Sequence, residues 1–142
     1  QAEALGARAV SPSEDIEGLC REIAGNRGGF DAAFEVSGVK GVMGTLLRSL
    51  RHEGVAVTIG HPSEPTEIDI AAIINKRGIT LRGIFGRRLW DTWHQLLLLV
   101  NAGKVDPEAI VTHRLPLSQV DHAVELLSGE AGKVLLIPSL KN

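Results

Sequence analysis

The stretch VAVTIG, residues 55–60, is a continuous run of mostly apolar, largely β-branched residues that stops at a glycine. Such a run is typical of a strand that is buried on both faces of a parallel sheet. Two similar runs flank it in the sequence, FDAAFEVSG at 30–38 and ITLRGIFG at 79–86. The three runs together predict neighbouring strands of one sheet.

Helical periodicity fills the segments between and after these runs. A helix capped by Ser13 is expected before NRGG (26–29), and a helix capped by Ser118 and Asp121 is expected to run to Leu127. Segments 39–51 and 87–102 are also expected to be helical, and a short helical turn is expected to begin at Asp106-Pro107. The segment 68–76 is expected to be a short helix or irregular. Strands are also expected near 7–10 and at 133–138. Helices that alternate with buried-type strands predict an α/β fold with a parallel sheet and right-handed crossovers.

Composition excludes several classes of protein. The 142 residues are 44% hydrophobic and 23% charged, as in an ordinary globular protein, and the net charge of -2 argues against a nucleic-acid partner. The longest apolar runs have about five residues, whereas a membrane span needs about 20, so no membrane partner is expected. A single cysteine excludes an internal disulfide and a multi-cysteine metal site, and it favours a reducing, cytoplasmic location.

The ends of the three buried strands are the places to look for a ligand, because ligands bind at the carboxyl ends of open parallel sheets. The loops there carry Ser37-Gly38, Gly60-His61-Pro62 and the segment 83–88. Glycine lets a flat ring or a sugar approach the backbone. Glycine is also common at strand ends for no functional reason, but three such loops in one sheet favour a shared ligand. No glycine-rich dinucleotide fingerprint or phosphate loop occurs in the chain.

Other chemistry-bearing residues give weaker signals. The five histidines and the cysteine lack metal-ligand spacing, so we predict no metal site, and no catalytic residue is assigned. His61 follows a strand-end glycine and could face a ligand. His113 and Arg114 could position a loop or meet a phosphate, or they could simply be packed. In RRLWDTWHQL (87–96), the two tryptophans share a helix face and are expected to pack inward.

The order of these motifs resembles that of a known family. GFDAAFEVSG, GVAVTIGHPS, ITLRGIFGRRLWDTWHQLLLLVNAGKVD and IVTHRLPLSQVDHAVELLSGEAGKVLLIP together look like the second half of a zinc-containing medium-chain alcohol dehydrogenase. Within that superfamily, GIFGRRLWDTW (83–93) and THR (112–114) look most like the L-threonine 3-dehydrogenases. The resemblance implies an NAD- and zinc-dependent oxidoreductase that oxidises L-threonine to 2-amino-3-oxobutanoate.

The resemblance also implies where the cofactor would bind. Ile59, Gly60 and His61 correspond to the family's cofactor contacts after a strand. Ile84 and Phe85 correspond to contacts near the nicotinamide. Ser37 and Gly38 correspond to the loop that borders the adenosine half of the cofactor. His61 departs from the family pattern, which has an aliphatic residue at that position. The zinc ligands, the glycine fingerprint and the acidic residue for the adenosine ribose lie upstream in such proteins.

The chain opens as if in the middle of a helix, which suggests a piece of a longer protein. We therefore expect it to be inactive alone. Residues 1–102 would form an incomplete Rossmann domain that lacks its first two strands. Residues 103–142 would return to the catalytic domain, although one compact unit is also possible.

Two consequences for strand pairing follow from the Rossmann order 3-2-1-4-5-6. The run at 30–38 would have an exposed edge. We therefore expect either that the strand near 7–10 moves beside this edge or that a second copy of the chain covers it. Homo-oligomers are expected to form through residues 79–86, as in the family.

Two other functions stay open. The parent could be a polyol or other secondary-alcohol dehydrogenase, because most of its small-molecule substrate pocket would lie upstream. The chain could also be a non-catalytic nucleotide-binding or dimerisation module.

Overall fold

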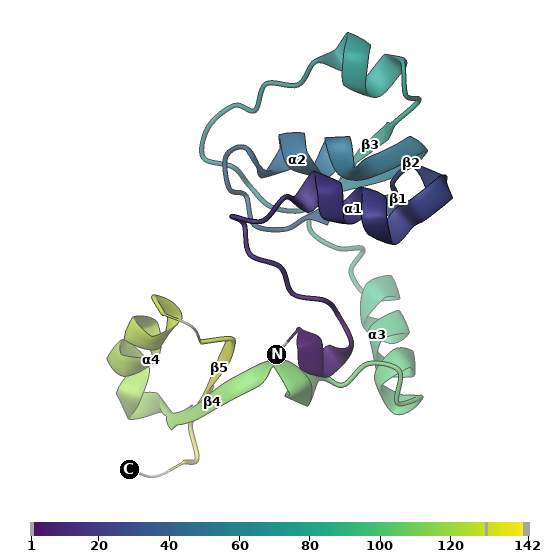
Figure 1. The fold of residues 1–142 in the computed structure, drawn as a ribbon. Coiled ribbons are helices and arrows are strands. Elements are labelled where there is room, and N and C mark those ends of the chain that lie inside the picture. Colours follow the sequence, from purple (N-terminus) through teal and green to yellow (C-terminus); the bar gives the residue numbers. More distant parts are fainter. Residues whose placement is uncertain (1, 130, 141–142) are drawn as a thin grey trace. The chain divides into compact units, whose positions relative to one another are not determined.

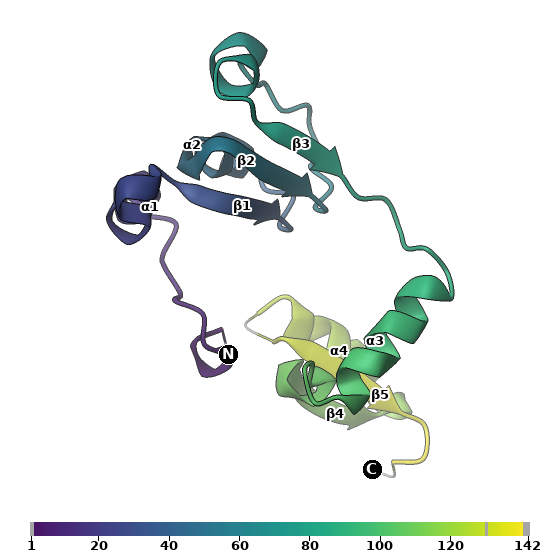
Figure 2. The same ribbon diagram turned by 90° about the vertical axis from the view of Figure 1, so that its right-hand side faces the viewer.

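Three parallel strands form the sheet that the sequence predicts. In the computed structural model, which describes residues 2–129 and 131–140, they are β1 (Phe30–Glu35), β2 (Leu50–Thr58) and β3 (Thr80–Gly83). The order is β1-β2-β3, and the strands run side by side with their carboxyl ends at one edge (Figure 2). The α/β class and the parallel sheet are therefore confirmed.

The chain divides into two compact units, Ala9–Arg87 and residues 1–8 with 88–142 (Figure 1). The first unit holds the three-stranded sheet. The second holds α3 (Asp91–Asn101) and a β-α-β crossover. The assignment of residues 1–102 to a Rossmann domain and of residues 103–142 to the catalytic domain stays a prediction.

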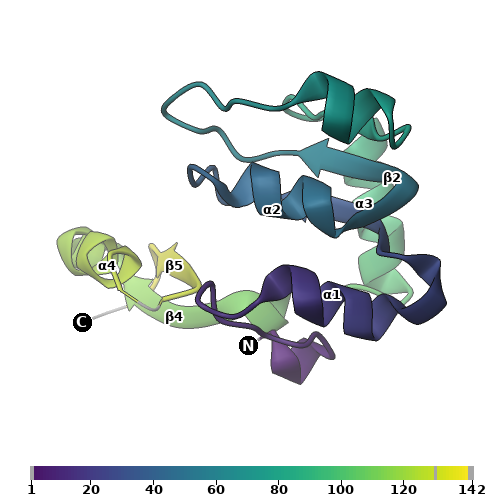
Figure 3. The same ribbon diagram turned by 45° about the horizontal axis from the view of Figure 1, so that its top comes forward.

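Helices cover one face of the three-stranded sheet. Helix α2 (Val42–Ser49) packs on β1 and β2, and α1 (Ile16–Ala24) packs beside α2 (Figure 3). A single π-helical turn, η3 (Ile70–Asn75), leads into β3. The buried core lies between these helices and the strands, and consists of Leu47, Leu50, Ala56 and Ile79 with six partly buried apolar neighbours.

The register of the strands shows which residues face the core. Ala33, Ala56 and Leu81 are aligned across the sheet, and Ala56 is fully buried. Because side chains alternate along a strand, Phe34 points to the other face, where it is 63% exposed. One face of the sheet is thus packed, while the Phe34 side is open within the described residues.

The second unit contains a strand that the sequence analysis missed. Strand β4 (Val111–Pro116) pairs in parallel with β5 (Lys133–Ile137), and α4 (Val120–Leu127) connects them. The short turn η4 (Pro107–Ile110) begins at Asp106, whose side chain accepts a hydrogen bond from the amide of Glu108, as expected. No helix in the described part of the chain is long and apolar enough to cross a bilayer.

Two predicted helix caps are wrong. Helix α1 is capped by Asp15, whose carboxylate accepts the Gly18 amide at 2.8 Å, rather than by Ser13. Helix α4 follows a 3₁₀ turn and begins after Gln119, which makes no side-chain cap bond, rather than after Ser118. Helix α1 thus begins two residues later than the pattern suggests and α4 one residue later, so another residue occupies each cap position.

The strand expected near residues 7–10 is not formed, because these residues have no regular secondary structure. The expectation that this strand moves beside β1 is therefore wrong. An extended segment becomes a strand only when a neighbouring strand takes up its backbone hydrogen bonds, and no described strand pairs with residues 7–10. Among the described strands β1 pairs only with β2, so its other edge stays open.

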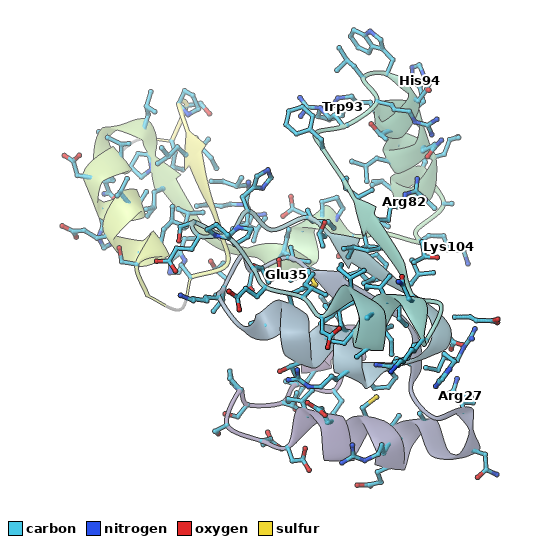
Figure 4. The ribbon with its side chains drawn as sticks, turned by 90° about the horizontal axis from the view of Figure 1, so that it is seen from above. Arg27, Glu35, Arg82, Trp93, His94 and Lys104 are labelled. Atoms are coloured by element: carbon cyan, nitrogen blue, oxygen red, sulfur yellow. The ribbon has the colours of Figure 1, made fainter. Side chains whose placement is uncertain are left out.

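The inward packing expected for the two tryptophans is also wrong. Trp90 is 66% exposed and Trp93 is 46% exposed, and helix α3 buries no residue. Figure 4 labels Trp93. The helix begins at Asp91, later than expected, because Trp90 has a left-handed backbone conformation with φ of 69°. The helical spacing does give α3 an apolar face, but the described residues provide no surface that buries it.

Candidate functional site

The carboxyl ends of β1, β2 and β3 meet at one edge of the sheet, where the sequence predicts a ligand. Thr58 is aligned with Glu35 on one side and with Gly83 on the other. The loops that follow the three strands therefore start next to one another. All of these residues belong to the unit Ala9–Arg87.

Five of the seven predicted cofactor residues line one open pocket of about 390 Å³. They come from the ends of two strands, β2 and β3: Ile59, Gly60, His61, Ile84 and Phe85, together with Thr58 and Gly83. The amide of Ile84 donates to the Thr58 carbonyl at 3.0 Å, which holds the two loops together. Phe85 is 94% exposed, so its ring is available as a wall of the pocket.

The other two predicted residues, Ser37 and Gly38, lie on the adjacent loop. A Cβ atom added to Gly38 would lie 2.9 Å from the carbonyl oxygen of His61, and the φ of Gly38 is +68°. A Cβ atom added to Gly60 would lie 2.4 Å from the Gly38 nitrogen. The loops after β1 and β2 are therefore in direct backbone contact, and glycine is required at both positions for steric reasons.

Glu35, at the end of β1, is a residue that the sequence analysis missed (Figure 4). The residue is 4% exposed, and its Oε1 atom accepts hydrogen bonds from the Ser37 hydroxyl at 2.6 Å and from the amides of Ser37 and Gly38, both at 2.9 Å. The Ser37 hydroxyl is therefore engaged within the loop. The available signal was a carboxylate at the end of a mostly apolar strand, two residues before Ser37.

These hydrogen bonds stabilise the ionised form of the carboxyl group. The Ser37 hydroxyl is the largest cause that lowers the pKa of Glu35 below its ordinary value of 4.5, and the two amides lower it further, while burial opposes them. Because the pKa is lower in the folded state, the stability that ionisation contributes is present above 4.5 and is lost as the pH falls through the folded-state pKa. The loop at 37–38 should thus be stable at neutral pH.

A second cavity, of about 220 Å³, shares Thr58 and Gly60 with the strand-end pocket. Glu35 lines it together with residues of α2, the strands and the 62–68 segment: Gly38, Val39, Met43, Thr58, Gly60, Pro62, Thr66, Ile68 and Leu81. Apart from Glu35, none of these residues is ionisable. The carboxylate is therefore the one charge of this cavity's lining.

His113 and Arg114 lie on β4, in the other unit. His113 Nδ1 is 2.9 Å from the Thr112 hydroxyl, and Arg114 forms an ion pair with Glu108. The charge of Arg114 is thus balanced by a carboxylate within the chain. This arrangement does not favour the phosphate contact considered for the pair.

Zinc does not fit the described residues. Nowhere in residues 2–129 and 131–140 do three His, Cys, Asp or Glu side chains converge as a metal would require. Cys20 is buried, and its thiol donates to the Ser49 carbonyl at 2.9 Å. We therefore derive no chemical step through zinc from these residues.

Comparison with known proteins gives a consistent family. The model of the family described as "Zinc-binding dehydrogenase" matches residues 1–102. The L-threonine 3-dehydrogenase of Symbiobacterium thermophilum is 42% identical over 115 residues, which are 80% of this chain and 33% of that protein. The L-threonine 3-dehydrogenase of Idiomarina loihiensis is 34% identical over 131 residues, 91% of this chain and 38% of that protein.

Solved structures support the same fold. The 2R,3R-butanediol dehydrogenase of Bacillus subtilis superposes with a TM-score of 0.86 at 31% identity, over 97% of this chain and 40% of that one. The L-idonate 5-dehydrogenase of Escherichia coli gives a TM-score of 0.76 at 25% identity, over 95% and 38%. The chain thus spans between a third and two-fifths of the length of these relatives.

Proposed function

Because the chain belongs to the zinc-binding dehydrogenase family, we propose that its strand-end pocket forms part of the NAD site of an L-threonine dehydrogenase. The observation that carries the proposal is the convergence of Ile59, Gly60, His61, Ile84 and Phe85 on one pocket. Relatives named as L-threonine 3-dehydrogenases support the substrate. The structural similarity to a butanediol dehydrogenase keeps a secondary alcohol of the diol type as the alternative.

NAD, when bound, supplies the acceptor for the hydride that leaves the alcohol carbon. The chain's own residues bind and orient it. Gly38 and Gly60 let the loops after β1 and β2 pack directly against each other beside the pocket. The apolar side chains of Ile59, Ile84 and Phe85 exclude water from a flat ring. Activation of the alcohol is not assigned to any described residue, so we propose that the chain does not catalyse the oxidation alone.

Two halves of the cofactor test this assignment separately. In NMR titrations of the chain at millimolar concentration, AMP should shift the amide signals of Ser37 and Gly38. Nicotinamide mononucleotide should shift those of Ile84 and Phe85. Binding of intact NAD measured by calorimetry should be very weak, because the sequence has no phosphate-binding loop.

Several outcomes of these measurements would contradict the proposal. Shifts confined to β4 around His113 would place the nucleotide elsewhere. A low-micromolar dissociation constant for NAD would refute the weak binding. Formation of NADH by the chain with L-threonine would refute its inactivity.

A dimerisation role is a second proposal, and it rests on the outer edge of β3. The backbone amide of Ile84 donates to the Thr58 carbonyl at the end of β2. Because successive amides of a strand alternate in direction, those of Leu81 and Gly83 point away from β2, toward an edge that no described strand pairs with. If two copies pair through residues 79–86, the sedimentation coefficient should rise with concentration and these two amides should become protected from hydrogen exchange. A chain that stays monomeric at all concentrations would contradict pairing at this edge.

A further inference from the structure

We propose that Glu35 is a positioning residue, whose carboxylate and carbonyl lock the loop after β1 to the loop after β2 and so fix the shape of the strand-end site. The importance of that shape for nucleotide binding rests on the function proposed above. The locking itself is a property of this chain and can be tested without any ligand.

The side chain of Glu35 holds its own loop. Its Oε1 atom accepts three hydrogen bonds, from the Ser37 hydroxyl and from the amides of Ser37 and Gly38, at 2.6 to 2.9 Å. Two successive backbone amides and a hydroxyl that converge on one oxygen match the acceptor capacity of an ionised carboxylate. The turn at 37–38 is thus folded around this atom.

The main chain of Glu35 holds the neighbouring loop. Its carbonyl oxygen accepts the amide of Ile59 at 2.8 Å and that of Gly60 at 3.0 Å. These two bonds continue the β1–β2 pairing beyond Thr58, the last residue of β2. One residue therefore satisfies four backbone amides, two on each loop.

The same carboxylate lies against the contact between the two loops. The Oε2 atom lies where a side chain of Gly60 would begin, since a Cβ atom there would be 2.4 Å from it. Gly60 in turn lies against Gly38 and lines both the 220 Å³ cavity and the 390 Å³ pocket. A shift of the Glu35 side chain would consequently move the wall that the two cavities share.

Few other charges can influence Glu35. The residues that face it across the 220 Å³ cavity are uncharged, namely Met43 of α2, Leu81 of β3, and Pro62, Thr66 and Ile68 of the following segment. The titratable groups on the facing loop include His61, whose backbone lies against Gly38, and the exposed Glu64 and Glu67. Glu64 forms an exposed ion pair with Lys40 of the loop after β1. The lowered pKa of Glu35 is consistent with a carboxylate that is held by its donors.

An NMR pH titration of the 142-residue chain tests the lock. We expect the amide signals of Ser37, Gly38 and Gly60 to move together with one midpoint below 4.5, the ordinary pKa of glutamate. In Glu35→Gln this titration should disappear, while the neutral-pH signals stay close to native because the amide oxygen still accepts hydrogen bonds. In Glu35→Ala the exchange of the Gly38 and Gly60 amides should become about tenfold faster. A role in stability alone would not produce a shared midpoint on both loops.

The control is Glu22→Gln, which removes an exposed carboxylate of α1 and should leave the titration intact. If Glu35→Ala stays folded by circular dichroism and the Gly60 amide is unchanged, the proposal is overturned. Should Glu35→Ala fail to fold, Glu35→Gln decides: a Gly60 signal that still titrates with the native midpoint overturns the lock.

AMP separates this proposal from the proposed function. If AMP shifts Ser37 and Gly38 in the native chain, its affinity should fall about tenfold in Glu35→Ala. An equal affinity overturns the role of Glu35 in shaping the site. If AMP causes no shift in the native chain, the nucleotide assignment fails, while the pH titration still decides whether Glu35 locks the loops.

Discussion

Replacement of Gly29 by alanine should lower the free energy of unfolding by about 3 kcal/mol or more. A Cβ atom at this position would lie 2.5 Å from the nitrogen of Arg51 and from the carbonyl carbon of Leu50. The φ of Gly29 is +151°, which side chains also disfavour. Since Leu50 is fully buried in the core, the backbone at the start of β2 cannot move away without disturbing that core. Urea unfolding followed by far-ultraviolet circular dichroism measures the change.

Gly28 is the matched control for this substitution. Its φ is +73°, but an added Cβ atom meets nothing within 4 Å. Gly28→Ala should therefore cost only the backbone strain, about 1 kcal/mol. If the two variants lose the same stability, the close approach of Gly29 to β2 is not what stabilises this corner of the fold.

The elements that could be predicted from the sequence are those whose pattern is local. The apolar run at 55–60 predicts β2 correctly as a strand. The burial on both faces that such a run indicates is not seen, because the described residues cover only one face of the sheet. The observed start of β2 at Leu50 was not predictable, since the register between β1 and β2 shifts between Phe30 and Ala32. Glu53 has a φ of +60° within this irregular part, and its amide donates to the Arg77 carbonyl. No pattern in the sequence encodes such a distant partner.

Elements that depend on a partner far along the chain were the ones missed. Strand β4 has mixed polar and apolar residues, and it exists because β5 pairs with it after the α4 crossover. The segment 7–10 has a comparable pattern but no partner strand, and it is not extended into a sheet. The apolar face of α3 shows the same principle, because amphipathic spacing predicts a buried face but not what buries it.

The candidate site could be predicted to the level of its loops but not of its hydrogen bonds. Strand ends with glycine indicate where backbone and ligand could approach each other, and five predicted residues do share a pocket. Glu35 was missed because a carboxylate near a strand end is usually solvated. Only the structure shows that Ser37 and Gly38 fold around it. The roles of these residues in binding a cofactor stay predictions.

Replacement of Gly60 by alanine should have the second largest effect, a loss of about 2 to 3 kcal/mol, together with loss of the AMP-induced shifts at Ser37 and Gly38. The added Cβ atom would lie 2.4 Å from the Glu35 Oε2 atom and 2.4 Å from the Gly38 nitrogen. The carboxylate can rotate away, whereas the Gly38 nitrogen belongs to the backbone, so the loops must separate. Urea unfolding measures the stability, and the NMR titration with AMP measures the site.

Two further variants show whether the effect of Gly60→Ala comes from this contact. Gly86→Ala, on the loop after β3, should cost only about 1 kcal/mol of backbone strain, because its φ is +56° and an added Cβ atom meets nothing within 4 Å. In the double variant Glu35→Ala/Gly60→Ala, the clash with the carboxylate is removed but the clash with Gly38 remains. The combined loss should therefore be smaller than the sum of the single losses. Strict additivity would show that Glu35 and Gly60 do not interact, and it would contradict the contact on which the shape of the site depends.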